Sequence, residues 1–207
     1  MLLAIPGADV RRRTALMEKA LRFRHAIFVE EKGCNDLQRP DRLERDPFDD
    51  ERAVHHVYLR DDEIVGYQRL LPTTRSHLLT DVLGDFRRSR PPRGPRLPER
   101  TRFCVAPGWR NFRRPPDGPF LELAQGVVEW GLACGIDTVT VVIDRRLMVI
   151  AMQLRFFARP LGFPKGIGRN EGVVLRMSFN RETLETIHEA RGCTAPVLAE
   201  SALDAAA

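Results

Sequence analysis

The strongest constraint on the fold is a pair of apolar runs joined by a short polar turn. The runs are residues 53–59 and 64–71, and Arg60-Asp61-Asp62-Glu63 separates them. Apolar runs of this length on either side of a polar turn are typical of a β-hairpin. Pro72 directly follows the second run and should end that strand, because proline has no backbone N–H to give to a sheet. The sequence therefore predicts two antiparallel strands in the first half of the chain.

Further elements are predicted on both sides of the hairpin. Residues 12–31 have apolar side chains at helical spacing, whereas residues 32–51 are rich in Gly, Pro, Asp and Arg and predict an irregular segment. Beyond the hairpin we expect a short helix at 77–86, strands at 101–106, 138–143 and 172–179, helices at 120–133 and 144–158, and a last helix followed by a tail that is disordered from about residue 195. This order predicts an α+β fold in which a mixed β-sheet is sandwiched between helices, in a single domain spanning residues 1–207.

Length, charge and cysteine usage narrow the class of protein. With 207 residues the chain is long enough to bury a core. Its formal net charge of +5 suits acidic partners in general, such as nucleic acid, a phosphorylated cofactor or an acidic carrier protein. The four cysteines form no Cys-x-x-Cys pair, so we expect no metal site and a reducing cytoplasm. Residues 1–7 do not read as a secretory signal, and no apolar run is long enough for membrane insertion.

Three charged clusters lie at the edges of apolar runs. Glu44-Arg45-Asp46-Pro47-Phe48-Asp49 precedes the hairpin, Arg69 stands near its end, and Glu99-Arg100-Thr101-Arg102-Phe103 leads into the next predicted strand. From such places a fold can direct polar side chains into a cleft. Carboxylates and arginines together suit a zwitterionic, amino-acid-like substrate. The alternative is that the carboxylates cap turns and the arginines form structural ion pairs.

Taken together, these clusters resemble the motifs of the acyl-homoserine lactone synthases, the autoinducer synthases of bacterial quorum sensing. The resemblance begins at Arg24 and Phe28 and continues through residues 44–49, 69–73 and 99–103. Weaker similarity follows at 168–179, so the resemblance extends over most of the chain. Residues 24–31 and 39–41 look most similar to the branch of the family that uses acyl-CoA carrying branched or aromatic acyl groups.

The resemblance implies an acyltransferase with a fold like that of the GNAT-type N-acyltransferases. Its substrates would be S-adenosylmethionine and an acyl-CoA, or an acyl carrier protein as donor and partner, with no permanently bound cofactor. The amine of S-adenosylmethionine would attack the acyl thioester, and the methionine carboxylate would then close the lactone and release methylthioadenosine. This chemistry needs a proton acceptor, hydrogen-bond donors for the thioester oxygen and a curled methionine moiety.

The resemblance also implies roles for individual residues. Glu99 is the expected proton acceptor, acting through water. The expected catalytic set is Glu99, Asp46, Asp49, Arg69 and Arg102, and the S-adenosylmethionine site would comprise Arg24, Phe28, Asp46, Asp49, Arg69 and Phe103. The acyl pocket would comprise Val142, Ile143, Met152 and Phe156. For Phe28, Phe103, Met152 and Phe156, the alternative is an ordinary place in the core.

Two features depart from the expected patterns and keep other functions open. Cys34 stands where the family usually has tryptophan, so an aromatic wall is missing. Residues 107–118 lack the Gln/Arg-x-x-Gly-x-Gly/Ala turn that holds the cofactor pyrophosphate in ordinary N-acyltransferases. A second hypothesis is therefore an N-acyltransferase that acts on another amine without forming a lactone. A third is a non-catalytic module that binds nucleic acid through residues 87–96, but it leaves the charged clusters unexplained and we expect no nucleic-acid partner. The sequence does not determine the oligomeric state.

Overall fold

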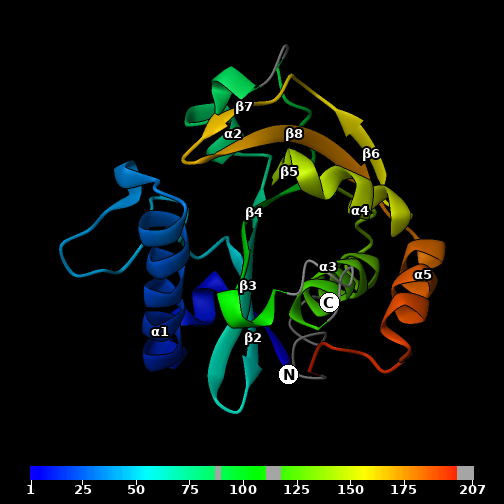
Figure 1. Ribbon diagram of the computed structural model, residues 1–207, viewed down its shortest axis with the longest axis horizontal. Coiled ribbons are helices and arrows are strands. Elements are labelled where there is room, and N and C mark those ends of the chain that lie inside the picture. The colour runs from blue at the N-terminus through cyan, green and yellow to red at the C-terminus, as the bar shows by residue number, and fades with distance from the viewer. Residues whose placement is uncertain (87–89, 111–117, 200–207) are drawn as a thin grey trace.

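A mixed β-sheet forms the centre of the computed structural model, which describes residues 1–86, 90–110 and 118–199 (Figure 1). In this part of the chain the sheet has eight strands in the order β1-β2-β3-β4-β5-β8-β6, with β7 paired to β8. The strands are β1 (Leu2–Pro6), β2 (Val54–Arg60), β3 (Glu63–Pro72), β4 (Pro98–Val105), β5 (Thr138–Asp144), β6 (Phe157–Pro160), β7 (Lys165–Ile167) and β8 (Asn170–Ser178). Strands β4 and β5 run parallel, and the other pairs are antiparallel.

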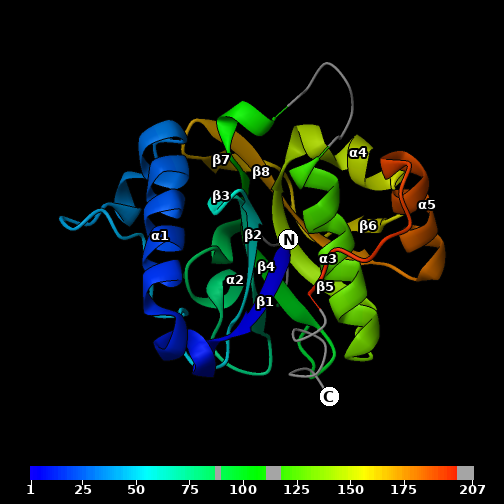
Figure 2. The ribbon, with the colours of Figure 1, turned by 90° about the horizontal axis from the view of Figure 1, so that it is seen from below.

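Helices cover both faces of this sheet. The α-helices are α1 (Thr14–His25), α2 (Leu78–Asp81), α3 (Pro119–Ala133), α4 (Met148–Gln153) and α5 (Arg181–Arg191). Shorter helical segments are the 3₁₀ turns Gly7–Arg13, Asn35–Leu37, Gly84–Phe86, Pro107–Trp109 and Arg145–Leu147, and the π-helix Ala26–Glu31 that continues α1. Figure 2 shows α1 on one side of the sheet, with α3 and α5 on the other. The predicted α+β fold, with a mixed sheet between helices, is confirmed. Within the described ranges, no helix combines the length and the apolar character needed to cross a bilayer.

The alternation of side chains along the strands divides the core into two main parts. Side chains of consecutive strand residues point to opposite faces of a sheet. On β3, Leu70 contributes to the larger cluster under α3, whereas Tyr67 contributes to the smaller cluster under α1. The charged residues described below occupy the α1 face, so β3 and β4 carry apolar packing on one face and the candidate site on the other.

The predicted hairpin is confirmed, but the helix predicted at 144–158 is wrong in its second half. Helix α4 ends at Gln153, and Phe157–Pro160 instead form β6, which pairs with β8. Between them Arg155 has a φ of 60°, a left-handed conformation that a continuous helix cannot contain. The prediction extended the helix too far because apolar residues continue at helical spacing past Arg155, where the backbone turns. Strands β1 and β7 had not been predicted.

Residues 195–199 also differ from the expectation of a disordered tail. The backbone N–H of Leu2 donates to Val197 O at 3.2 Å, and Ala199 N donates to Leu2 O at 3.1 Å. The Leu198 side chain is buried in the larger core cluster. Both Val197 N and Leu198 N donate to Glu129 Oε2 of α3 at 3.2 Å. These residues thus form a short parallel bridge beside β1, while the rest of the predicted tail, 200–207, lies outside the described residues.

Truncation of the Leu198 side chain tests this arrangement. We expect Leu198→Ala to lower the free energy of unfolding by about 2–3 kcal/mol, because it leaves a cavity in a buried cluster. Urea denaturation monitored by circular dichroism measures the change. The control is Val149→Ala, since Val149 is exposed on α4 and its truncation should change stability by less than about 0.5 kcal/mol. Equal effects of the two substitutions would mean that residues 195–199 are not packed as described.

Candidate active site

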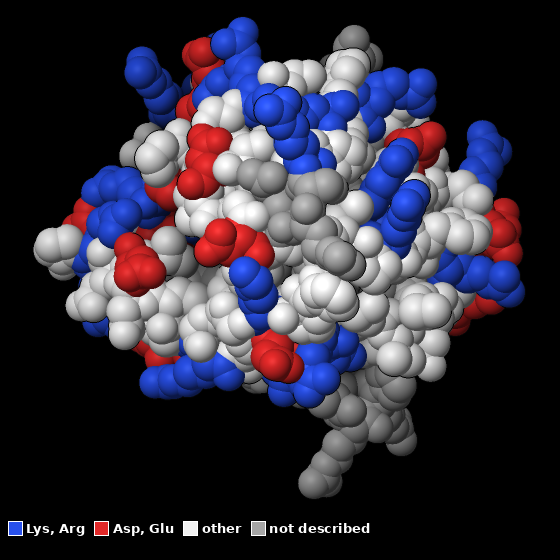
Figure 3. All heavy atoms as spheres, turned by 90° about the horizontal axis from the view of Figure 1, so that it is seen from above, with Lys and Arg blue, Asp and Glu red and all other residues white. Residues whose placement is uncertain are grey.

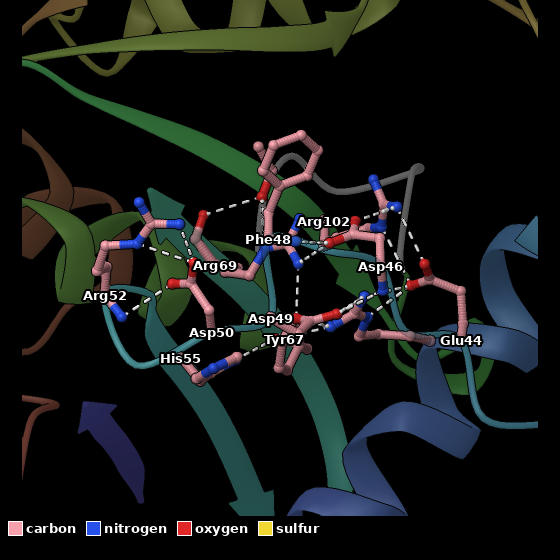
Figure 4. Close-up of polar contacts among 12 residues, drawn as sticks. Glu44, Asp46, Phe48, Asp49, Asp50, Arg52, His55, Tyr67, Arg69 and Arg102 are labelled. Carbon is pink, nitrogen blue, oxygen red and sulfur yellow. Dashed lines mark hydrogen bonds and ion pairs between the residues drawn. The ribbon is translucent and has the colours of Figure 1, made fainter. Parts of the chain in front are cut away.

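Six charged side chains from separate parts of the chain form one network on the α1 face of the sheet (Figure 4). They are Arg24 of α1, Glu44, Asp46 and Asp49 of the segment before β2, Arg69 of β3, and Arg102 of β4. Three guanidinium groups thereby meet three carboxylates, and the network has no net charge. The structure brings together five of the residues predicted for the site and adds Glu44.

Asp49 lies at the centre of the network. Its Oδ1 accepts hydrogen bonds from Arg24 Nη1 at 2.7 Å and Arg69 Nη1 at 2.6 Å. Its Oδ2 accepts from Arg24 Nη2 at 3.0 Å and from the backbone N–H of Asp46 at 3.0 Å. Burial opposes ionisation, but the two guanidinium groups outweigh it and hold the pKa of Asp49 well below its usual range. Asp49 is therefore ionised at neutral pH.

Asp46 joins Arg69 to Arg102. Arg69 donates to both carboxylate oxygens of Asp46, through Nη1 at 2.7 Å and Nη2 at 2.9 Å, and Arg102 Nη2 donates to Oδ2 at 2.8 Å. This bidentate geometry is the strongest form of an arginine–carboxylate pair. Arg69 also donates through Nε to Thr101 Oγ1 on β4 at 3.1 Å. Each nitrogen of the fully buried Arg69 guanidinium therefore has a partner.

Glu44 completes the network as a carboxylate shielded from solvent. It accepts from Arg24 Nε at 2.6 Å, and from Arg102 Nε at 3.1 Å and Nη2 at 3.0 Å. Burial tends to raise the pKa of Glu44, but Arg24 and Arg102 lower it to about 2. The sequence contained Glu44 within the cluster 44–49, yet nothing in its spacing distinguished it from Asp46 or Asp49.

A backbone irregularity in β4 directs Arg102 toward this network. Arg102 has a φ of 55°, and the pairing of β3 with β4 shifts register between Tyr67 and Arg69. Such a bulge places two residues of one strand opposite one of its partner and changes the face to which a side chain points. The side chain of Arg102 consequently lies on the α1 face, next to the side chain of Thr101. A left-handed conformation is uncommon for arginine, and its occurrence here fits a functional constraint.

Tyr67 and His55 extend the network through further hydrogen bonds. Neither residue had been predicted for the site. Tyr67 OH accepts from Arg24 Nη1 at 3.2 Å and lies 2.6 Å from His55 Nδ1. Burial raises the pKa of Tyr67 to about 12 and lowers that of His55 to about 4, so both groups are neutral near pH 7. The signal that could have identified Tyr67 is its position two residues before Arg69, which puts both side chains on one face of β3.

Glu99 is buried on the same face but lies outside the network. Its Oε2 accepts the backbone N–H of Leu79 in α2 at 3.2 Å. Burial raises the pKa of Glu99 to about 7, although the Leu79 N–H and the charge of Arg69 oppose this. Thr140 of β5 stands opposite Glu99 in the sheet, and its buried hydroxyl has no hydrogen-bond partner among the described residues. The pair therefore offers a carboxyl group that can exchange a proton near neutral pH beside a free hydroxyl.

The two aromatic residues predicted for the S-adenosylmethionine site lie on opposite faces of the sheet. The Phe28 ring is close to the network, with Arg102 Cζ 5.6 Å and Lys32 Nζ 4.5 Å from its centroid. Phe103 points the other way and packs edge-on against Phe120 of α3, with ring centroids 5.3 Å apart. The structure therefore places Phe28 beside the network and separates Phe103 from it.

The four residues predicted for the acyl pocket do not converge. Val142 and Ile143 are consecutive on β5 and point to opposite faces. Val142 packs with the cluster near α2, and Ile143 packs against the larger core. Phe156 is buried against Phe179, with ring centroids 6.1 Å apart, and Met152 on α4 is 62% exposed. The prediction of one pocket lined by all four residues is wrong, because it did not take the alternation of strand faces into account.

The remaining sequence features fall at the edges of the site. Cys34 lies beside the turn between β7 and β8, where Arg169 N donates to Lys32 O at 2.9 Å. Residues 107–118 lack the pyrophosphate-binding turn of ordinary N-acyltransferases, and of these, 111–117 lie outside the described residues, as do 87–89 of the arginine-rich stretch 87–96. Arg93 and Arg96 of that segment donate to the protein's own backbone oxygens, at Thr73 and Gly135 respectively. Figure 3 shows Lys and Arg interspersed with Asp and Glu on the face seen from above.

Comparisons with known proteins agree with this geometry. Residues 8–187 match the sequence profile of a family described as autoinducer synthase. An isovaleryl-homoserine lactone synthase of Bradyrhizobium diazoefficiens is 30% identical over 194 residues, which cover 93% of this chain and 86% of that protein. A structure of BjaI, a CoA-dependent acyl-homoserine lactone synthase, with SAM and isopentyl-CoA has a TM-score of 0.84 and 27% identity, covering 100% of this chain and 98% of BjaI. An acyl-CoA N-acyltransferase from Pseudomonas aeruginosa has a TM-score of 0.56 and 17% identity over 85% of this chain and 97% of that one, which shows the shared N-acyltransferase-like fold alone.

The network predicts that the protein loses stability as the pH falls through the acidic range. Glu44 has a pKa of about 2 in the folded protein against an ordinary value of 4.5, so its stabilising contribution is present above pH 4.5 and is lost as pH falls toward 2. We expect Glu44→Gln to cost about 3–5 kcal/mol at pH 7, because two buried guanidinium groups lose a partner. The difference from the wild type should shrink between pH 5 and 3, as measured by urea denaturation.

A surface ion pair provides the control for this experiment. Glu18 contacts Arg22 on the exposed side of α1 at 2.7 Å. Glu18→Gln should change stability by less than about 1 kcal/mol at either pH. A Glu44→Gln protein as stable as the Glu18→Gln protein at pH 7 would contradict the assigned role of the network.

Proposed function

The chain belongs to the autoinducer synthase family, and from this premise we propose that it is an acyl-homoserine lactone synthase that uses S-adenosylmethionine and an acyl-CoA. The observation that carries the proposal is the buried network of three arginines and three carboxylates on the α1 face, with Glu99 on the same face of the same strand as Arg102. Such an arrangement can hold a zwitterion and accept a proton within one site.

Within the network, differences in exposure support different roles for the carboxylates. The side chains of Arg24 and Glu44 are fully buried, and they fix the segment 44–49 against α1. The side chains of Asp46 and Asp49 are 8% and 12% exposed, so each can present an oxygen to a substrate cation while retaining its arginine partners. We assign these two carboxylates to the ammonium and sulfonium end of S-adenosylmethionine. The Phe28 ring next to Arg102 is placed to stack on its adenosine.

Glu99 is the proposed proton acceptor in amide formation. A catalytic base works best when its pKa is close to the operating pH, and burial gives Glu99 a pKa of about 7. A water molecule held between Glu99 and the free hydroxyl of Thr140 would carry the proton from the substrate ammonium. The amine nitrogen then forms a bond to the thioester carbon, and the carbon–sulfur bond breaks to release the CoA thiol.

Lactone closure requires no further proton acceptor. The carboxylate of the methionine moiety attacks the carbon next to the sulfonium, so that a carbon–oxygen bond forms and methylthioadenosine leaves as a neutral thioether. The contribution of the protein is to hold the methionine moiety curled, which turns the step into a favourable intramolecular reaction. The partly exposed Asp46 and Asp49 can stabilise the sulfonium in that orientation.

Release of methylthioadenosine tests the proposed function. The purified protein should produce it from S-adenosylmethionine and at least one member of a panel of straight, branched, aromatic and carboxylated acyl-CoAs, as detected by mass spectrometry. Acyl carrier protein thioesters of the same chains provide the comparison, and we expect the CoA thioesters to be used with the higher kcat/KM. Absence of methylthioadenosine with every donor would overturn the proposal. An amide product formed without methylthioadenosine would instead favour an N-acyltransferase that does not close the lactone.

The role of Glu99 has a separate kinetic test. We expect Glu99→Gln to lower kcat about a hundredfold, which is the usual contribution of general-base catalysis. The wild-type kcat should rise with pH and level off above about 7, where Glu99 is ionised, and this limb should be absent in the variant. Glu63→Gln, at the exposed start of β3, is the matched control. A variant that retains the pH limb would exclude Glu99 as the base.

A further inference from the structure

Arg100 is a buried cation on the opposite face of β4 from the network. It is 6% exposed and lies between Leu70 of β3 and Val141 of β5 in the sheet register. Its Nε donates to Gln68 Oε1 at 2.7 Å, and its Cζ lies 4.3 Å from the centroid of the Phe103 ring. Its Nη2 is buried and has no hydrogen-bond partner among the residues that the structure describes. The Arg100 guanidinium therefore has an unused hydrogen-bond donor, Nη2, in a largely apolar environment.

Among the residues that the structure describes, the lack of a carboxylate partner distinguishes Arg100 from the other buried arginines. Arg24, Arg69 and Arg102 each contact two carboxylates. In the described part of the chain, Arg100 forms no ion pair. Burial lowers the pKa of Arg100 to about 9, which still leaves it charged at neutral pH. A buried charge without a counter-charge is costly, so a fold that retains one has a free site for an anion.

The position of Arg100 in the sheet indicates which ligand it meets. Strands β4 and β5 pair only at Glu99–Thr140 and Arg100–Val141, although β4 continues to Val105 and β5 to Asp144. Beyond this point, Phe103 of β4 and Ile143 of β5 are only partly buried and pack on the larger core from the α3 side. Arg100 thus stands at the last paired position, where the two strands part and an apolar group can enter between them.

Arg100 is also held in place by a second buried polar residue. Gln68 Nε2 donates to Leu123 O of α3 at 2.9 Å and lies 2.9 Å from His56 Nδ1. These contacts leave Gln68 Oε1 facing Arg100 and fix the direction of the guanidinium. The arrangement is a prepared site rather than a mobile side chain, because Gln68 and His56 are fully buried.

We propose that Arg100 binds a carboxylate carried by the acyl group of the donor, so that the enzyme selects a carboxylated acyl-CoA over an unsubstituted one. The inference rests on the proposed function and adds the chemical class of the acyl donor. A carboxylate is the complement that supplies both the missing negative charge and acceptors for the free N–H groups. The charged network lies on the other face of β4, so the acyl carboxylate would be bound by Arg100 apart from the residues proposed to bind S-adenosylmethionine.

Matched thioesters test this specificity. Rates of methylthioadenosine release are measured with glutaryl-CoA against pentanoyl-CoA and with succinyl-CoA against butanoyl-CoA, for the wild type, Arg100→Leu and the control Arg159→Leu, whose arginine is exposed on β6. We expect the wild type and the control to favour the carboxylated member of each pair by about tenfold or more in kcat/KM. Arg100→Leu should reverse the preference, with a change in the ratio of about a hundredfold, as expected for a lost hydrogen bond to a charged group.

Thermal unfolding provides a readout that does not depend on turnover. Without ligand, Arg100→Leu should have a higher Tm than the wild type, because leucine removes an uncompensated buried charge. Glutaryl-CoA should raise the Tm of the wild type more than pentanoyl-CoA does, and this difference should vanish in the variant.

The possible failures can be distinguished. If the wild type favours the unsubstituted donor in both pairs, or if Arg100→Leu leaves the ratio unchanged, the inference is overturned and the proposed function stands. If no thioester yields methylthioadenosine, the proposed function fails, and the inference fails with it.

Discussion

The shared carboxylate of Asp49 is the interaction on which the site depends. It joins a guanidinium of α1 to one of β3, and its own segment is fixed by the Asp46 N–H. Three pieces of chain far apart in sequence are thereby held in one position. The desolvation of so many charges is unfavourable in itself, and the network compensates by giving each ion several charge-assisted partners. The network stabilises the fold because every charged group in it has partners, and no single ion pair accounts for this effect.

Strand β4 divides the chemistry of the molecule between its two faces. The bulge at Arg102 adds this side chain to the α1 face, where the candidate base Glu99 also lies. The same strand sends Arg100 and Phe103 to the α3 face, at the point where β4 and β5 cease to pair. The proposed amine substrate and the proposed acyl donor would therefore approach one strand from its two sides. The amine and the thioester would then have to meet at the edge of β4 where it no longer pairs with β5.

The sequence was informative where chemistry depends on residue type and spacing along one strand. The hairpin and the mixed sheet could be predicted from such patterns, whereas Arg24, Asp46, Asp49, Arg69 and Arg102 were predicted from the resemblance to a known family. The sequence was uninformative where a prediction depends on which face of the sheet a side chain occupies, or on which residues lie opposite it in the core. The acyl-pocket prediction failed for the first reason. That no carboxylate of the described residues pairs with Arg100 is a property of its three-dimensional surroundings, and so no spacing pattern could have shown it.

The bridge between Leu2 and Leu198 has a consequence for the solubility of the chain. Strand β1 stands at the end of the sheet order, and an end strand offers free backbone groups to any other extended chain. Residues 197–199 occupy part of that edge through the hydrogen bonds of Leu2. The C-terminal segment thus acts as a cover that discourages sheet-to-sheet association between copies. Loss of these few residues would turn a protected edge into a template for aggregation.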